Sequence, residues 1–284
     1  MRVRILTIRL SVSDKGGEFV VIPHQLDVKI TEEHLSDVTL NRPSSEKEYK
    51  HQYRKLNEGV SVAKAAGLKS SVISHLKTNK PTCPVLYLLN KTHKLVSSND
   101  VASTNPSSFK ARPIISCVNE PTDRITWFLS LILTQLLNHI PAHLTNTEMF
   151  LERLRDASPN NACVMESFDL TALYTNVSND SVMQAIFELL VEHEGKIKMR
   201  GLSIQKLMAL LKECLNCSTF RWSGKYYAQI RKLVMGRRLA PSLAIAFMSR
   251  VEASVLGLRP LLYCRYIDDC FVICRRRPTN ALNY

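Results

Sequence analysis

Two adjacent aspartates lie between two apolar segments near the end of the 284-residue chain. They are Asp268 and Asp269, within "RYIDDCFVI". The flanking aromatic and β-branched residues predict two strands with at least one buried face, joined by a turn that holds both carboxylates rigidly. Two rigid like charges favour a bound cation, and hard divalent cations such as Mg²⁺ prefer oxygen ligands. An ordinary solvated turn is the other interpretation, because aspartate is common in turns.

A third carboxylate stands at the end of another predicted strand. The segment "NACVMESFDL" has strand-like character and delivers Asp169 near its end. Two ions about 3.5–4 Å apart can activate an attacking hydroxyl and neutralise a leaving group, and such a site needs carboxylates from neighbouring strands. Asp169 is therefore our candidate partner for Asp268 and Asp269 around two Mg²⁺ or Mn²⁺ ions. A helix cap or a turn would also use an aspartate here.

The segments after residue 160 predict an antiparallel sheet. Their order is strand, two helices, hairpin, helix and hairpin, which is typical of an α+β fold with helices on one face of the sheet. Ser178 and Ser203 precede apolar helical patterns, as helix caps do. Ser223 and Gly224 favour a tight hairpin turn. Such a sheet would place the strands that carry the three aspartates near one another.

The preceding residues predict a basic helical region with a pair of strands. Residues 44–80 show helical periodicity among many lysines. The segments "VLYLLNKTHK" and "ARPIISCV" predict two strands joined by a polar loop, an arrangement suited to gripping phosphates. A buried helix is expected from Thr122 or Asp123 to about Leu137. Nearer the N-terminus, "SDKGGEFVVIP" predicts a glycine turn that leads into a short strand at a sheet edge.

The charge pattern favours a polyanionic partner. The formal net charge is +13, and residues 41–112 hold 13 Lys and Arg against 4 Asp and Glu, which leaves +9 in about a quarter of the chain. A balance this basic is typical of binding to nucleic acid or to an anionic membrane surface. The longest apolar stretch, residues 125–133, is too short to cross a membrane, and the N-terminal arginines do not fit a signal peptide. We expect an intracellular, non-secreted protein without a membrane segment, with the nucleus as one location.

Taken together, these segments resemble the reverse transcriptases, and most closely those of Penelope-like retroelements. The resemblance rests on three palm motifs, "SFDLTALYTNV", "QIRKLVMGRRLAPSLAIAFM" and "RYIDDCFVI". Upstream, "LYLLNKTHK", "ARPIISCVNEPTDRITWFLSLIL" and "SDKGGEFVVIP" are similar to further motifs in the family's order. The resemblance implies an α+β right-hand polymerase fold, with an N-terminal extension at 1–43, basic fingers at 44–160 and a palm at 161–284.

The resemblance also implies roles for single residues. Asp169 and Asp268 would hold the two metals, with Asp269 as a supporting ligand. Tyr174 stands where the family has the aromatic residue that blocks a 2′ hydroxyl and so selects deoxynucleotides. Arg112 would clamp the incoming triphosphate, because a planar guanidinium can meet phosphate oxygens in a bidentate way. The nucleotide-binding residues implied in this way are Lys110, Arg112, Leu170, Thr171, Tyr174, Met235 and Gly236.

Several neighbouring positions keep more than one interpretation. Lys91 and Lys94 could assist the triphosphate, touch the template, or form a solvated surface. Gly236 would let the backbone approach the nucleotide and the template base. Arg237 and Arg238 stand where many reverse transcriptases have small or neutral residues. These arginines would either strengthen binding to the nucleic-acid backbone or crowd the nucleotide.

The function implied by the resemblance is RNA-directed DNA synthesis. Two metal ions would promote in-line transfer of a nucleotide from dNTP to a DNA primer 3′ hydroxyl on an RNA template, mainly through positioning and charge neutralisation. Because the sequence ends at Tyr284, we expect a truncated piece without the thumb or the GIY-YIG-type nuclease that often follows in Penelope-like elements. A catalytically inactive nucleic-acid-binding remnant is the main alternative, and a palm-fold nucleotidyl cyclase is a third. The sequence leaves the oligomeric state open.

Overall fold

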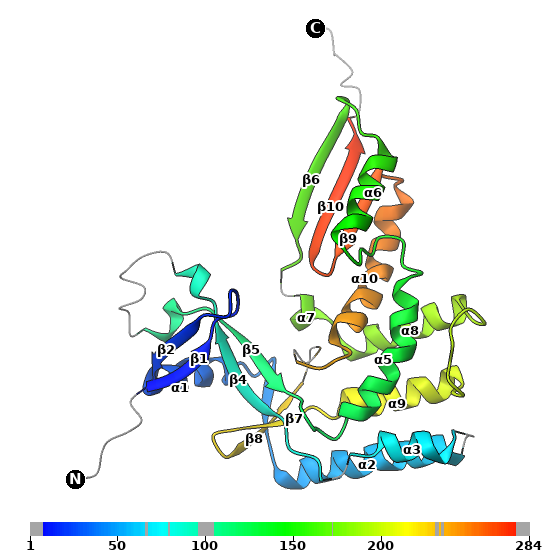
Figure 1. Ribbon diagram of the computed structural model, residues 1–284. Coiled ribbons are helices and arrows are strands. Elements are labelled where there is room, and N and C mark those ends of the chain that lie inside the picture. Colours follow the sequence, from blue (N-terminus) through cyan, green and yellow to red (C-terminus); the bar gives the residue numbers. More distant parts are fainter. Residues whose placement is uncertain are drawn as a thin grey trace.

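The protein has an α+β fold in which helices pack beside three separate sheets (Figure 1). The sheets have two, three and five strands among the described residues. No helix in the described part of the chain is long and apolar enough to cross a membrane. The computed structural model describes residues 8–65, 68–78, 80–95, 105–171, 173–230, 233 and 236–276.

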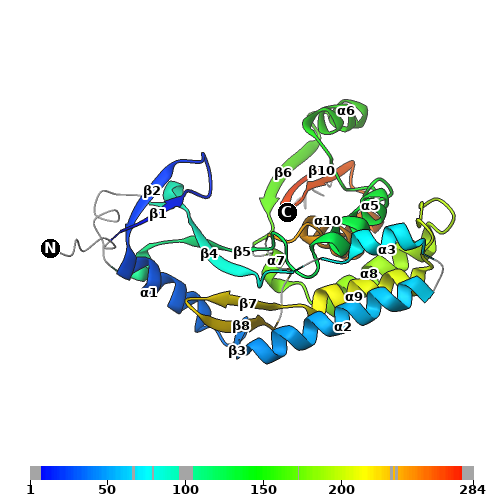
Figure 2. The ribbon, with the colours of Figure 1, turned by 60° about the horizontal axis from the view of Figure 1, so that its bottom comes forward.

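The longer helices share one large apolar core. The described α-helices are α1 (His24–Leu35), α2 (Glu46–Ala65), α3 (Ser70–Leu76), α5 (Asp123–Leu137), α6 (Thr147–Ala157), α7 (Leu173–Asn176), α8 (Asn179–Glu192), α9 (Ile204–Asn216) and α10 (Ala240–Gly257). In Figure 2, α2, α3, α8 and α9 lie side by side, and their apolar side chains form one cluster with those of α5 and α10. Within α5, Ile132, Leu133 and Leu136 are completely buried, as its apolar pattern predicted. Ser178 and Ser203 cap α8 and α9 as predicted, each accepting a hydrogen bond from a backbone N–H.

The three-stranded sheet has the strand order β6-β10-β9 and is antiparallel throughout. Its strands are β6 (Cys163–Asp169), β9 (Leu262–Tyr266) and β10 (Asp269–Arg275). The turn from β9 to β10 consists of Ile267 and Asp268. These elements confirm the predicted strand before Asp169 and the predicted hairpin around the aspartate pair.

Helices cover both faces of the β9–β10 hairpin, although the sequence predicted helices on one face. Side chains alternate between the two faces of a strand. On one face, the Tyr263 hydroxyl donates a hydrogen bond to Glu252 of α10 at 3.3 Å. On the other face, the Phe271 ring packs edge-on against Phe150 of α6, with ring centroids 5.2 Å apart. Both faces of the hairpin carry buried side chains, so a helix packs against each face, α10 on one and α6 on the other.

The five-stranded sheet has the order β3-β8-β7-β4-β5. Its strands are β3 (Asn41–Ser44), β4 (Val85–Asn90), β5 (Ala111–Ser116), β7 (Thr219–Trp222) and β8 (Lys225–Gln229). β4 and β5 pair antiparallel, which confirms the two strands predicted around the polar loop. Ser223 and Gly224 both have positive φ in the turn from β7 to β8, as predicted. This hairpin nevertheless pairs with β3 and β4 and not with the strands that carry the aspartates.

A two-stranded N-terminal hairpin lies against the five-stranded sheet. β1 (Ile8–Val12) and β2 (Phe19–Pro23) pair antiparallel. Their connection includes Gly16 and Gly17, which both have positive φ, a conformation that glycine adopts without steric cost. Contacts between β1 and β4 attach this hairpin to the larger sheet.

Candidate active site

The three predicted aspartates lie at one end of the three-stranded sheet. Asp169 is the last residue of β6 and pairs directly with Asp269, the first residue of β10. The backbone N–H of Leu170 donates a hydrogen bond to the carbonyl oxygen of Asp268 at 2.9 Å, which joins the turn to the end of β6. Asp169 and Asp269 are exposed, and Asp268 is half-buried. Two segments distant in the sequence therefore bring carboxylates to the same solvent-accessible end of the sheet.

The donor chemistry at this end fits a hard cation that binds together with a substrate. Among the described residues, no three His, Cys, Asp or Glu side chains are placed to hold a metal ion by themselves. Asp169 and Asp269 offer carboxylate oxygens from paired positions. Mg²⁺ usually keeps several waters and is bound by one or two carboxylates plus substrate phosphates. The residues present could therefore bind Mg²⁺ if a nucleotide supplied the remaining oxygens.

A strained turn carries Asp268. Ile267 has a φ of +55°, and this left-handed conformation is unfavourable for a β-branched residue. The guanidinium of Arg265 stabilises the turn by donating a hydrogen bond from Nη1 to the carbonyl oxygen of Ile267 at 2.8 Å. The placement of Asp268 therefore depends on how firmly Arg265 is held.

Arg265 is held by a buried ion pair with α10. Its Nε and Nη2 groups both donate to the carboxylate of Glu252, and Nη2 also reaches the carbonyl oxygen of Ile245 at 3.3 Å. The side chains of Arg265 and Glu252 are 0% and 1% exposed. No role was predicted from the sequence for either residue. The sequence did contain a signal for this ion pair. Glu252 is the single glutamate of an apolar helix and Arg265 the single arginine of an apolar strand, and buried charges are nearly always paired.

Tyr174 lies within electrostatic reach of both the aspartate turn and the basic strand β5. Burial raises the pKa of its hydroxyl, the negative charge of Asp268 raises that pKa further, and the positive charge of Arg112 lowers it. Tyr174 is half-buried in α7. Leu170, which is half-buried, and Thr171, which is exposed, follow the end of β6. Five predicted positions thus belong to one region of the molecule: Arg112, Asp268, Leu170, Thr171 and Tyr174.

Basic residues gather at one end of the β4–β5 pair. Arg112 lies in β5 with 44% of its side chain exposed, and its Nε is 3.2 Å from a carboxylate oxygen of Asp14. Lys110 is exposed just before β5, and its carbonyl oxygen accepts a hydrogen bond from the backbone N–H of Lys91 at 2.8 Å. Lys94 is also exposed. The predicted triphosphate-binding residues Lys110 and Arg112 therefore share this end of the β4–β5 pair with Lys91 and Lys94.

Gly236 lets the chain pass very close to β5. Its φ is +107°, and a Cβ at this position would lie 2.3 Å from the carbonyl oxygen of Ile115. A side chain here would force the backbone apart. The contact shown for this glycine is thus with β5, whereas the sequence predicted an approach to the nucleotide and template. The neighbouring predicted residue, Met235, lies outside the described residues.

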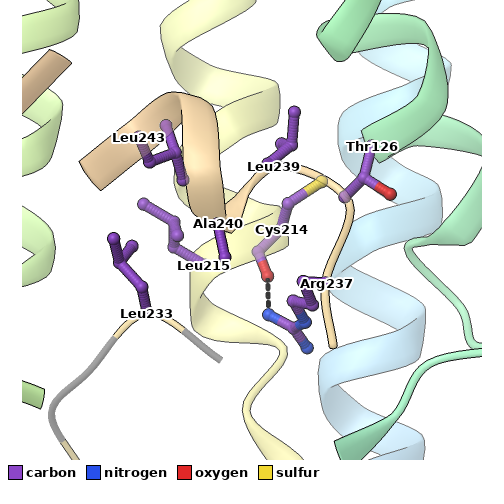
Figure 3. Close-up of a pocket in the computed structure, with 8 residues that line it drawn as sticks. All are labelled: Thr126, Cys214, Leu215, Leu233, Arg237, Leu239, Ala240 and Leu243. Atoms are coloured by element: carbon purple, nitrogen blue, oxygen red, sulfur yellow. Dashed lines mark hydrogen bonds between the residues drawn. The ribbon is translucent and has the colours of Figure 1, made fainter. Parts of the chain in front are cut away.

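Arg237 is a buried structural residue. Its Nε lies 3.3 Å from Glu120, and its Nη1 donates a hydrogen bond to the carbonyl oxygen of Cys214 at 2.8 Å (Figure 3). Burial lowers the pKa of Arg237, but the charge of Glu120 and nearby thiols more than offset this, and the pKa lies above its ordinary value. Arg238 is exposed and lies 3.8 Å from Asp123. Because Arg237 is buried, it can neither bind the nucleic-acid backbone nor crowd the nucleotide, the two roles that the sequence suggested.

The family of the protein follows from comparison with known sequences. The model of the family described as "Reverse transcriptase (RNA-dependent DNA polymerase)" matches residues 103–283, more than half of the chain. The chain therefore belongs to the reverse transcriptase family. The matched region contains the basic strand β5 and all three aspartates. A sequence search of curated proteins found no match.

Solved telomerase structures share the fold. Telomerase from Candida albicans in complex with a TWJ fragment of telomeric RNA matches with a TM-score of 0.59 and 12% identity, over 94% of this chain and 45% of that chain. Apo telomerase from Candida tropicalis matches with a TM-score of 0.59 and 9% identity, over 96% of this chain and 47% of that chain. The chain thus spans less than half the length of these two telomerases. Because each likeness covers more than nine tenths of this chain, it extends beyond the residues matched by the family model.

Proposed function

We propose that this chain is an RNA-directed DNA polymerase domain that transfers nucleotides from dNTPs to the 3′ hydroxyl of a primer on an RNA template. Membership of the reverse transcriptase family supports this class of reaction. The observation that carries the proposal for this chain is the direct pairing of Asp169 with Asp269, with Asp268 in the adjoining turn. Carboxylates grouped in this way are suited to nucleotidyl transfer with bound divalent cations.

The chain's own residues would bind and orient the reactants. Asp169 and Asp268 would hold two Mg²⁺ or Mn²⁺ ions, with Asp269 as the supporting ligand. When bound, the ions would activate the primer hydroxyl and neutralise the leaving pyrophosphate. Arg112, assisted by Lys110, would bind the triphosphate, since a guanidinium can form two parallel hydrogen bonds with phosphate oxygens. Most of the acceleration would come from positioning and electrostatic stabilisation.

Within the family, we assign the chain to the Penelope-like retroelements. The assignment rests on the three palm motifs and on the upstream motifs that precede them in the family's order, including "SDKGGEFVVIP". Phylogenetic placement of residues 103–283 among reverse transcriptases tests this assignment. Grouping with telomerases, or with another class of retroelement, would overturn it and leave the proposed reaction unchanged.

Primer extension by the purified 284-residue chain tests the proposed reaction. With an RNA template, a DNA primer, dNTPs and Mg²⁺ or Mn²⁺, we expect template-directed products that disappear when the metal is chelated. Asp268→Asn removes a charged metal ligand without changing its size, so extension should fall by at least about a hundredfold. Asp156→Asn, at an exposed position of α6, is the matched control and should retain activity.

Two results would contradict this proposal. One is the absence of template-directed product from the wild-type chain with either metal. The other is extension that Asp268→Asn leaves unchanged. Salt-sensitive binding to primer–template without extension, and without any effect of Asp268→Asn, would instead identify a nucleic-acid-binding remnant, because phosphate contacts alone would then carry the affinity.

A further inference from the structure

A buried carboxylate lies against the proposed triphosphate-binding arginine. The side chain of Asp14 is 1% exposed, and one of its oxygens lies 3.2 Å from Nε of Arg112. Among the described residues, neither oxygen of Asp14 has a hydrogen-bond partner of good geometry. A buried carboxylate is strongly unfavourable without a compensating positive charge. Within the described part of the chain, Arg112 is the residue that supplies this charge.

The N-terminal hairpin brings Asp14 to this place. The backbone N–H of Asp14 donates a hydrogen bond to the carbonyl oxygen of Asn90, the last residue of β4, at 2.8 Å. The residue before it in β4, Leu89, pairs directly with Arg112 across the β4–β5 ladder. The hairpin turn is therefore docked beside the position from which Arg112 projects. Asp14 lies before the residues matched by the family model, so the family match does not include this contact.

Within the described part of the chain, the ion pair leaves the two Nη groups of Arg112 without a partner. Asp14 contacts Nε, and no described residue forms a hydrogen bond or ion pair with either Nη group of Arg112. Almost half of the Arg112 side chain is exposed. A guanidinium held through Nε still presents two Nη donors in a fixed plane, which suits a bidentate contact with phosphate. Arg112 also acts on Tyr174, because its positive charge lowers the pKa of that hydroxyl while the charge of Asp268 raises it.

We propose that Asp14 is a positioning residue for nucleotide binding. By holding the Nε side of Arg112, it directs the Nη side toward the triphosphate of an incoming nucleotide. A side chain that is already held in its binding conformation loses less entropy when the ligand binds. The inference rests on the proposed polymerase function and adds the N-terminal hairpin to the nucleotide site.

Asp14→Asn tests the role because it keeps the size of the side chain and removes its charge. In primer extension, the KM for dNTP should rise about fivefold to twentyfold while kcat changes by less than about twofold, as expected for an interaction made equally in the bound substrate and in the transition state. A calorimetric titration of the chain with dATP and Mg²⁺, in the absence of primer, should show a similar loss of affinity.

Asp27→Asn is the matched control. Asp27 is a 3% exposed carboxylate in α1 that pairs with the partly exposed Arg9 at 2.5 Å. The substitution therefore breaks a comparable ion pair in the same N-terminal region without touching Arg112. It should lower the melting temperature about as much as Asp14→Asn does, yet leave the KM for dNTP and the affinity for dATP unchanged.

A double variant separates positioning from general destabilisation. When Asp14→Asn is added to a chain that already carries Arg112→Lys, the KM for dNTP should rise by less than about twofold above that of Arg112→Lys alone. Lysine has no planar fork for Asp14 to orient. A KM and dATP affinity that Asp14→Asn leaves unchanged or improves would overturn the positioning role, as would an equal effect of Asp27→Asn. Absence of extension by the wild-type chain would count against the polymerase function instead, and the dATP titration alone would then decide the role of Asp14.

Discussion

Tyr174 contributes both to the fold and to the candidate site. The charge of Asp268 raises the pKa of its hydroxyl, and the charge of Arg112 lowers it. Its backbone carbonyl oxygen accepts a hydrogen bond from the N–H of Leu233 at 3.0 Å, and its ring packs against the main apolar core. A ring held in this way has little freedom to move aside for a bulkier substrate.

The position of Tyr174 predicts a change in sugar selectivity on truncation. In Tyr174→Ala, the preference for dNTP over rNTP should fall by about tenfold to a hundredfold, because the smaller side chain leaves room for a 2′ hydroxyl. The ratio of kcat/KM values for dGTP and GTP in primer extension measures this preference. Tyr174→Phe keeps the ring and should keep the selectivity. Equal selectivity of the alanine variant and the wild-type chain would remove Tyr174 from the sugar-binding part of the site.

At the scale of elements, α10 supports the aspartate turn through one buried ion pair. Glu252 of α10 holds Arg265 of β9, and Arg265 in turn holds the carbonyl oxygen of Ile267. Buried ion pairs often add little stability compared with apolar residues of similar size, but breaking one by removing a single partner is strongly destabilising. This difference allows stability and turn geometry to be tested separately.

Single and double substitutions of this pair should have different effects. Glu252→Gln leaves the charge of Arg265 uncompensated and should lower the free energy of unfolding by about 3 kcal/mol. Glu252→Leu combined with Arg265→Met should recover most of that stability, yet extension should remain about tenfold below wild type, because the strained Ile267 carbonyl loses its donor. Urea unfolding and primer extension measure the two effects. Full extension activity in the double variant would show that Asp268 does not depend on Arg265.

At the scale of the whole molecule, positive charge is concentrated in one part of the chain. The net charge is +13, and residues 41–112 contribute +9 of it, from 13 basic and 4 acidic residues. This region includes α2, α3 and β4 and ends in β5 at Arg112. Charge of this kind attracts the phosphate backbone of nucleic acid and releases the counterions bound to it.

The charge distribution predicts salt-dependent binding to RNA–DNA primer–template. Between 50 and 200 mM salt, affinity should fall by at least about tenfold, because each phosphate contact releases counterions. Replacing Lys91 and Lys94 together by glutamine should reduce the slope of log affinity against log salt by up to about two. Fluorescence anisotropy measures both quantities. The matched control replaces Lys196 and Lys198, in the α8–α9 connection far from β4 (Figure 1), and an equal effect there would contradict a site at β4 and β5.

Local patterns predicted most of the secondary structure, because they act between residues close in the sequence. Ser178 and Ser203 each cap a helix through a backbone group a few residues ahead, and Ser223 with Gly224 forms a turn through its own backbone preferences. The positions of Asp169, Asp268 and Asp269 at strand ends were also predicted, whereas the direct pairing of Asp169 with Asp269 comes from the tertiary structure. The roles of these aspartates in catalysis remain predictions.

By itself, the sequence determined where most of the strands and helices form and that the aspartates stand at strand ends, since periodicity, caps and turns act over short separations. Only the tertiary structure decided which sheet the β7–β8 hairpin joins and that helices cover both faces of the β9–β10 hairpin. It also decided that Arg237 pairs with Glu120 and Arg112 with Asp14. Burial and charge compensation select such partners in three dimensions, and residues distant in the chain carry no local pattern that identifies them.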